Sequence, residues 1–205
     1  MREKERMSLG KLYDNMKDNL NKDREKAHGL CLDYNKLYET QVEERKKILK
    51  ELLPNSSELI YLQGPIQFDY GFNTYFGDGC YANFNLLILD VAPVRIGKDT
   101  LFGPNVSLLT PMHPFLAEER KGFENDEGNY TDIEYSKEIN IGERCWIAGN
   151  VTICGGVTIG DECIIGAGSV VTRDIPSGYL AAGNPCRIIR KITKEDSVYL
   201  KKELL

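Results

Sequence analysis

Two histidines are the side chains of this 205-residue chain that could transfer a proton near neutral pH, because a free imidazole titrates at about 6.5. His113 stands in the segment Met112-His113-Pro114, where a long polar stretch begins. His28 stands among charged residues in a region with helical character, and we interpret it as structural. A single histidine in a loop is by default a turn residue, so the role of His113 depends on the elements that position it.

The six cysteines do not form the pattern of a metal site or of a thiol nucleophile. No CxxC pair occurs, and two histidines supply too little imidazole for a zinc site, so we predict no bound metal. Cys145 and Cys163 share one phase of the repeat described next, which indicates small core residues in a reducing compartment. No cysteine has the neighbouring histidine signature expected of a nucleophile.

A six-residue repeat governs the second half of the chain. The aliphatic positions are Ile141, Ile147, Ile153, Ile159, Ile165 and Val171, each followed by a small or compact residue. A helix cannot use a period of six, but a triangular coil with one strand and one corner per hexad can, and its stacked turns bury the aliphatic column. The same phase appears earlier at Ile96, Phe102 and Leu108. The repeat therefore predicts a mainly β fold, a parallel β-helix.

Two segments depart from the repeat. The phase is lost over residues 111–138, and we expect these residues to form a long protruding loop, which is usually functional. Apolar residues recur at helical spacing before the coil, at Leu9, Leu12, Met16 and Leu20 and again at Leu30, Tyr34, Leu37 and Tyr38. We expect a helical cap over residues 1–55, a coil over 56–190 with the loop 111–138, and a charged tail over 191–205. The cap covers the open end of the coil and could also form one wall of a pocket.

The composition excludes several function classes. The net charge is -5, whereas a nucleic-acid-binding protein is expected to carry a basic surface. No apolar run approaches the length of a membrane span, and the first six residues lack a secretory apolar region. We therefore expect a cytoplasmic protein of one principal domain that binds neither nucleic acid nor membrane.

Several segments resemble those of the maltose and galactoside O-acetyltransferases. They are Gly10-Lys11-Leu12-Tyr13, Asp69-Tyr70-Gly71-Phe72-Asn73, Tyr81-Ala82-Asn83-Phe84-Asn85 followed by Leu89-Asp90, Met112-His113-Pro114, and Asn184-Pro185 with Arg187. The resemblance covers nearly the whole chain, from about Met7 to Lys191. It implies a left-handed β-helix, a homotrimer with active sites between neighbouring coils, and transfer of an acetyl group from acetyl-CoA to a sugar hydroxyl.

The resemblance assigns the chemistry to His113. A sugar hydroxyl is a poor nucleophile, so a base must take its proton as the oxygen attacks the thioester carbonyl, and an imidazole suits that work. The family route is direct attack in a ternary complex, without an acetyl-enzyme. By the same resemblance Gly149 faces the thioester, where family members often have serine. Glycine can offer only its backbone amide to the oxyanion.

The resemblance also supplies the binding residues. Asn83 and Asp90, and more weakly Asp69 and Asn15, carry over as sugar contacts, although asparagine and aspartate are equally suited to turns. Some relatives have aspartate where this chain has Asn15, with Asp14 adjacent. The expected coenzyme contacts are Ala167, whose small side chain lets the pantetheine arm approach, and Thr172, Arg173, Arg187 and Arg190 for amides and phosphates.

Two other functions stay open at this point. The acceptor could be an amino sugar, an antibiotic or another hydroxyl compound, because Asn15 and Asp69 depart from relatives. A bare coil could also be a non-catalytic scaffold, which would show no thermal shift with CoA. The sequence does not rank maltose, glucose and galactosides as acceptors, and it leaves open whether Glu118, Glu119 or Asp126 orients His113.

Overall fold

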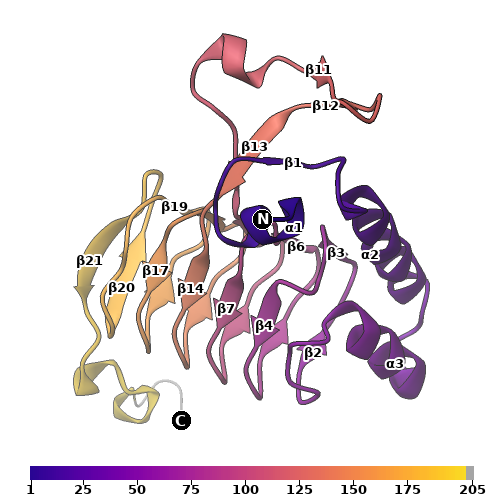
Figure 1. Cartoon of the computed structure of the whole chain (residues 1–205). Helices are drawn as coiled ribbons and strands as arrows, with labels where there is room; N and C mark the ends of the chain where they lie inside the picture. The colour runs from indigo at the N-terminus through magenta and orange to yellow at the C-terminus, as the bar shows by residue number, and fades with distance from the viewer. Residues whose placement is uncertain (202–205) are drawn as a thin grey trace.

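Short strands alternate with sharp corners through most of the chain, as the six-residue repeat predicts (Figure 1). The computed structural model describes residues 1–201, whose strands stack as the turns of a parallel β-helix. Two helices cover one end of the coil, β20 and β21 lie at the other end, and a long loop rises from the side. The predicted β-helix with a helical cap and a protruding loop is therefore confirmed.

Three sheets form the sides of the coil, and within each side the strands pair in parallel with the turns above and below. The first sheet contains β4 (Thr74–Phe76), β7 (Val94–Ile96), β14 (Ile139–Ile141) and β17 (Thr158–Ile159). The second contains β2 (Tyr61–Leu62), β5 (Tyr81–Ala82), β8 (Leu101–Phe102), β15 (Trp146–Ile147), β18 (Ile164–Ile165) and β20 (Tyr179–Ala182), with β21 (Arg187–Lys191) antiparallel at its end. The third contains β3 (Ile66–Phe68), β6 (Leu86–Leu89), β9 (Ser107–Leu109), β16 (Thr152–Cys154) and β19 (Val170–Val171).

The aliphatic phase of the repeat fills the interior of the coil. Its six positions from Ile141 to Val171 are all buried, and so is the compact phase at Cys145, Val151, Val157, Cys163, Ser169 and Ile175. Burying one aliphatic side chain of this kind stabilises a fold by about 1.5–3 kcal/mol. The stacked columns therefore hold the turns together along the whole coil.

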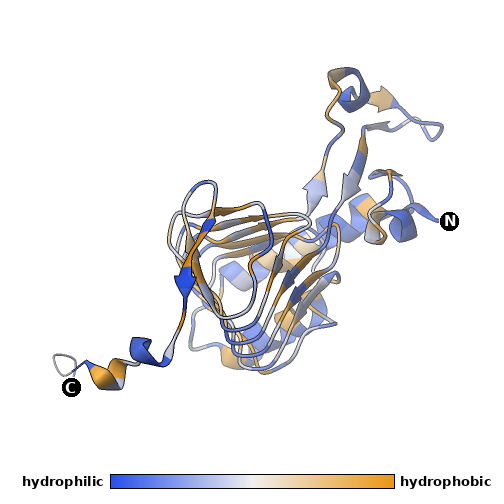
Figure 2. Cartoon of the chain, turned by 90° about the vertical axis from the view of Figure 1, so that its left-hand side faces the viewer, coloured by the Kyte–Doolittle hydropathy of each residue, from blue (hydrophilic) through white to orange (hydrophobic). Residues whose placement is uncertain are grey.

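Two of the three corners matter for function. The asparagine corner joins the second sheet to the third, and its residues with positive φ are Gly64, Asn85, Asn105, Asn150 and Gly168. Asn85 Nδ2 donates to Asn105 Oδ1 at 2.8 Å, and Asn105 Nδ2 donates to Asn150 Oδ1 at 3.1 Å. The histidine corner joins the third sheet to the first and consists of the residues that follow β3, β6, β9, β16 and β19. Figure 2 shows the protruding loop at one corner of the triangular coil and β21 on another side.

The cap is fixed to the first turn by one buried cation. Helices α2 (Leu20–Asn35) and α3 (Val42–Leu52) cover the open end, and Arg45 of α3 is buried against the coil. One Arg45 guanidinium nitrogen donates to the Tyr34 hydroxyl at 2.8 Å and to the carbonyls of Leu62 and Gln63 at 2.6 and 2.9 Å. The cap thus satisfies carbonyls of the first turn that lack a preceding turn.

The chain before α2 is not the helix predicted from Leu9, Leu12, Met16 and Leu20. Helix α1 (Glu3–Ser8) ends before Gly10, whose φ of +66° lies in the left-handed region. Strand β1 (Tyr13–Asp14) then pairs antiparallel with β13 (Ile133–Ser136) from the protruding loop. The helical spacing was misleading because burial of Tyr13 against the loop decides the local structure.

The loop predicted over residues 111–138 leaves the core after Thr110 and returns at β14. It contains β10 (Pro111–Met112), η1 (Ala117–Arg120), β11 (Phe123–Glu124), β12 (Tyr130–Thr131) and β13. Strand β13 lies between β1 and β10 in a small antiparallel sheet. Asp14 fixes the loop, because its carboxylate accepts hydrogen bonds from Thr131 Oγ1 at 2.7 Å and Asn125 Nδ2 at 2.8 Å. The N-terminal segment therefore positions the base of the loop.

The tail expected over 191–205 begins with short helical turns. These are η2 (Lys194–Asp196) and η3 (Val198–Leu200), and residues 202–205 lie outside the described part of the chain. Among the described residues, no helix is both long enough and apolar enough to span a bilayer.

Candidate active site

His113 lies directly after β10 at the histidine corner, where its ring faces acidic side chains at the start of β13. Its Nδ1 lies 3.5 Å from Asp132 Oδ2, and about half of the side chain is exposed. Glu134 completes the group, since one ligand-type atom of each of the three side chains lies within 4.8 Å of the others. One imidazole nitrogen is thus directed at a carboxylate, which leaves Nε2 for a substrate.

Strand β1 holds these carboxylates in place. Asn15 Nδ2 donates to Asp132 Oδ1 and to Glu134 Oε1, both at 2.9 Å, and the Tyr13 hydroxyl donates to Glu134 Oε2 at 2.5 Å. Burial, and then the charge of Glu134, raise the pKa of Tyr13, so this hydroxyl stays a donor. His, Asp and Glu are side chains that bind divalent cations, but these donors compete with a cation for three of the four carboxylate oxygens.

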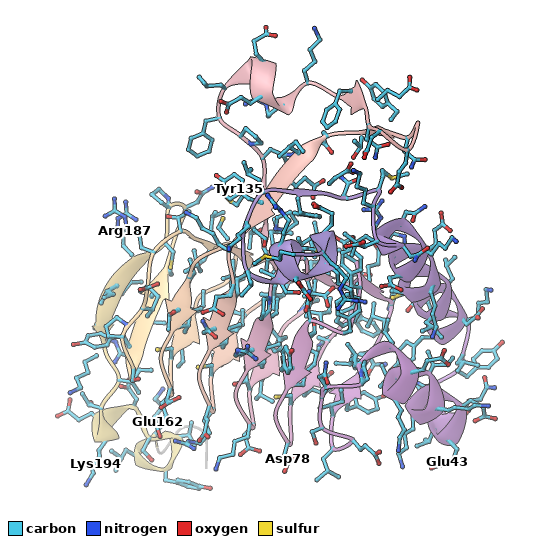
Figure 3. All side chains as sticks on the ribbon, in the orientation of Figure 1. Glu43, Asp78, Tyr135, Glu162, Arg187 and Lys194 are labelled. Carbon is cyan, nitrogen blue, oxygen red and sulfur yellow. The ribbon has the colours of Figure 1, made fainter. Side chains whose placement is uncertain are left out.

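The carboxylate that faces His113 belongs to Asp132. The three carboxylates near His113 in the sequence, those of Glu118, Glu119 and Asp126, do not face it. Glu118 and Glu119 lie exposed in η1, and Asp126 forms an ion pair with Lys17. Asp132 is further along the chain, but β13 folds back beside β10 and brings it to the imidazole. Tyr135, the residue after Glu134 on β13, is labelled in Figure 3 where the loop meets the N-terminal segment.

Replacing Asp132 by asparagine is expected to lower kcat about tenfold, because a charge-assisted interaction with a histidine is worth about 1.5–3 kcal/mol and this one is long and partly exposed. The KM for acetyl-CoA should not change. Steady-state kinetics checks this, with Asp126→Asn in the same loop as the matched control. Equal kcat values for the two variants would remove Asp132 as the residue that orients His113.

Asp69 follows β3 at the first turn of the histidine corner and lines a pocket of about 400 Å³ between α2 and the third sheet. His28 Nε2 lies 3.6 Å from its carboxylate, which is beyond hydrogen-bond distance. Burial raises the pKa of Asp69, and the charges of His28 and Arg24 oppose that effect. His28, which the sequence indicated to be structural, therefore faces a residue predicted to bind substrate.

Asp90, predicted as a sugar contact, lies inside the fold, where backbone and side-chain donors already bind its carboxylate. Its side chain is fully buried and accepts hydrogen bonds from the backbone amides of Tyr70 and Asn73 and from Thr74 Oγ1. Burial raises the pKa of Asp90 to about 6, although these donors favour the charged form. Asp90 instead holds the turn that carries Asp69, as turn chemistry alone would have allowed.

A second group of predicted residues gathers at the asparagine corner. Asn83 follows β5, Gly149 follows β15, and Ala167 follows β18, so they occupy different turns of this one corner. Asn83 Oδ1 accepts from the Phe84 amide at 2.7 Å, which leaves its Nδ2 available. The Gly149 amide donates to no carbonyl or side chain in the described residues and is only half-buried. Arg187 pairs with Ala182 at the end of the same corner, and Figure 3 shows its side chain pointing away from the coil.

The remaining coenzyme candidates lie elsewhere. Thr172 and Arg173 follow β19 and are exposed at the histidine corner. Arg190 is on β21 opposite Leu180, and its two terminal nitrogens donate to Asp196 at 2.8 and 2.6 Å. Arg190 is therefore committed to the tail, whereas Arg187 bonds only the carbonyl of Cys186 among the described residues.

The cysteines match the prediction of core thiols. All six are free, and five of them are buried. Burial raises the pKa of Cys31 to about 11 and also raises that of Cys154 and Cys186. Such thiols stay protonated at neutral pH and are poor nucleophiles.

Comparison with known proteins identifies the group to which this architecture belongs. The maltose acetyltransferase hexapeptide capping motif matches residues 6–56, and the bacterial transferase hexapeptide (six repeats) matches residues 138–173. Galactoside O-acetyltransferase of Escherichia coli (strain K12) is 41% identical over 199 residues, which cover 97% of this chain and 94% of the relative. The chain belongs to the maltose and galactoside O-acetyltransferase family.

Solved structures of family members have the same fold. A maltose O-acetyltransferase from Clostridium difficile 630 matches with a TM-score of 0.85 at 40% identity, covering 95% of this chain and 99% of that one. A galactoside acetyltransferase in complex with coenzyme A matches with a TM-score of 0.83 at 38% identity, covering 96% and 94%. These matches confirm the predicted left-handed β-helix.

Within this family framework, the structure adds residues that the sequence did not single out. Asp132 and Glu134 lie in the loop without any motif of their own, and Tyr13 was noted only as part of the family's opening segment. In the sequence, only the loss of the six-residue repeat pointed to this loop as functional. It did not show which segment pairs with the strand that carries Asp132 and Glu134. The pairing of β1 with β13 is what brings them to His113.

Proposed function

We propose that this chain transfers the acetyl group of acetyl-CoA to a hydroxyl of a sugar, with His113 as the general base. The observation that carries the proposal is the imidazole at the histidine corner with Nδ1 directed at Asp132 and half its surface open. Membership of the family supports the reaction class, because its relatives are named galactoside and maltose O-acetyltransferases and one is bound to coenzyme A.

In the proposed reaction His113 Nε2 removes the hydroxyl proton as the sugar oxygen attacks the thioester carbonyl. Asp132 stabilises the imidazolium that results, and Asn15 keeps Asp132 in position. The new C–O bond forms first, the C–S bond then breaks, and His113 returns the proton to the departing sulfur. No acetyl-enzyme is required, which fits the burial of five of the six cysteines.

The free amide of Gly149 is the proposed donor to the oxyanion of the tetrahedral intermediate. Ala167, next to it along the asparagine corner, leaves open space for a pantetheine arm, and Arg187 at the end of that corner is available for phosphates. Arg190 is a weaker candidate because Asp196 already occupies it.

We infer further that the complete site forms between two copies of the chain. His113 and Gly149 lie on different corners, and the third sheet separates these corners. One side of the coil is roughly 15 Å long, because a strand rises about 3.3 Å per residue. An attacking hydroxyl and a thioester must instead approach within about 3–3.5 Å. A neighbouring copy that places its asparagine corner beside the histidine corner removes this gap.

Surface composition supports the same arrangement. The outward residues of the second sheet include Leu101 and Trp146, which are 47% and 52% exposed, and the third sheet presents Leu87 and Leu89. The first sheet presents Tyr75, Arg95, Asn140 and Thr158 instead. The two sides that flank the asparagine corner are thus the more apolar ones, which supports a trimer that packs them together.

The proposed activity is tested by following free thiol release from acetyl-CoA with a panel of sugars and simple amines. Release that depends on a sugar is expected. Release with amines alone would place the protein among N-acyltransferases, and no release with any acceptor would favour a scaffold.

A further inference from the structure

The carboxylate of Asp69 lacks a hydrogen-bond donor although it is largely buried. Its side chain is 19% exposed, and no donor of the described residues reaches it; the closest cation, His28 Nε2, is 3.6 Å away. A carboxylate removed from water without donors costs free energy. A donor supplied by a bound molecule would offset that cost.

The neighbouring residue shows the same deficiency. Tyr70 is buried, with 4% of its surface exposed. Its hydroxyl has no hydrogen-bond partner in the described part of the chain. The charges of Asp69 and Glu134 act on this hydroxyl, so it belongs to the same polar group as the two carboxylates. Two adjacent polar side chains, one with a single long ionic contact and one with no hydrogen bond, indicate a ligand rather than a structural network.

The charges around this point are predominantly negative. Glu134 acts on both Asp69 and Tyr70, Asp132 lies beside Glu134 at His113, and Arg24 is the one permanent cation acting on Asp69 and Tyr70 among the described residues. His28 and His113 are the other titratable groups there. A ligand that brings a positive charge and several donors therefore fits better than a neutral one.

The pocket beside Asp69 can hold a ring. It encloses about 400 Å³, within the usual range for small-molecule sites of about 300–1,000 Å³. Phe68, Leu87 and Leu89 line one part of it, on the side of the coil that a neighbouring copy would close, and His28 and Asp69 lie at another. Figure 1 shows α2 beside β3, with β1 and β13 above them, so this pocket and the base of the loop share one side of the molecule.

Resting on the proposed function, we propose that the acceptor is an amino sugar, whose ammonium group binds Asp69 while a hydroxyl of the same molecule is acetylated at His113. The ammonium nitrogen has no lone pair, so the acetyl group is transferred to oxygen and the product is an ester. The hydroxyl proton leaves through His113 to the CoA sulfur, as in the proposed reaction.

The test uses four methyl glycosides with one ring stereochemistry: glucoside, glucosaminide, N,N-dimethylglucosaminide and N-acetylglucosaminide. The dimethylated amine keeps the charge but cannot form a stable amide, and the acetylated amine loses the charge. We expect kcat/KM for both cationic glycosides to exceed that of the glucoside by about tenfold, which corresponds to about 1.4 kcal/mol. Mass spectrometry should detect the ester of the dimethylated compound.

Asp69→Asn is expected to reduce the ratio of kcat/KM between the cationic glycosides and the neutral glucoside to about one. Asp33→Asn removes the same charge from the exposed part of α2, where Asp33 pairs with Lys36, and should keep the preference. Equal or better use of the neutral glucoside by the unaltered protein would overturn the inference and leave the proposed function intact. A preference that survives Asp69→Asn would overturn it too.

Failure of the reaction itself is distinguishable. It is possible to measure the preference for the cationic glycoside even when no thiol is released from acetyl-CoA with any of the four compounds. Calorimetry then compares the binding of the methyl glucosaminide and of the methyl glucoside to the intact protein. Tighter binding of the cationic compound that is lost in Asp69→Asn supports the site, and equal binding overturns it.

Discussion

Replacing His113 by alanine is expected to lower kcat by about 100-fold or more, the usual effect of removing a general base. The imidazole makes one long contact, 3.5 Å from Nδ1 to Asp132 Oδ2, and is half exposed, so its loss should leave the fold unchanged. The KM for acetyl-CoA should stay the same, because Gly149, Ala167 and Arg187, which are proposed to bind it, lie on another corner. Thiol release under saturating acetyl-CoA measures the effect.

A loop control separates loss of the base from disturbance of the loop. Glu119→Ala alters an exposed side chain of η1, away from the carboxylates that face His113, and is expected to keep full activity. Far-ultraviolet circular dichroism and the melting temperature should coincide for all three proteins. Unchanged kcat in His113→Ala would exclude this histidine as the base, whatever the acceptor.

The second large effect is on stability. Gly71 has a φ of +76°, and a Cβ placed on it would lie 2.1 Å from the Leu52 carbonyl oxygen at the end of α3. Gly71→Ala is therefore expected to lower the free energy of unfolding by about 3 kcal/mol or more, since overpacking costs about 1–3 kcal/mol and left-handed backbone adds about 1–2 kcal/mol. A thermal melt should show a fall of roughly 6–12 °C.

A matched glycine isolates the clash from the backbone strain. Gly128 has nearly the same φ, +77°, but its added Cβ would meet only the end of the Glu124 side chain at 3.8 Å. Gly128→Ala should lose only the backbone contribution of about 1–2 kcal/mol. If the two variants melt alike, the contact between α3 and the turn carrying Asp69 is not as tight as described.

The coil was predictable because its signal is periodic. Six aliphatic positions with compact partners define one interior, and all of them are buried as the period requires. The bounds of the loop were predictable for the converse reason, that the residues of 111–138 cannot continue the column.

The parts that the sequence did not predict depend on pairing between distant segments. Tyr13 and Glu134 are neighbours only because two short strands meet, and no local pattern records that pairing. Asp90 was assigned to substrate because a carboxylate suits both a sugar and a turn, and only its burial separates the two roles. His28 lay among charged residues of a helix, and its position opposite Asp69 depends on how the cap packs on the coil.

Two variants, each of which disables a different corner, test most directly whether the site is shared between copies. His113→Ala breaks the histidine corner, and Ala167→Trp blocks the asparagine corner at an exposed position. Each variant alone should be inactive. Trimers formed from equal amounts of the two variants should regain about a quarter of the activity of the unaltered protein. In such trimers, about a quarter of the neighbouring pairs combine an intact histidine corner with an intact asparagine corner. If the mixture is no more active than the two variants measured separately, both corners must act within one chain, and the shared site is wrong.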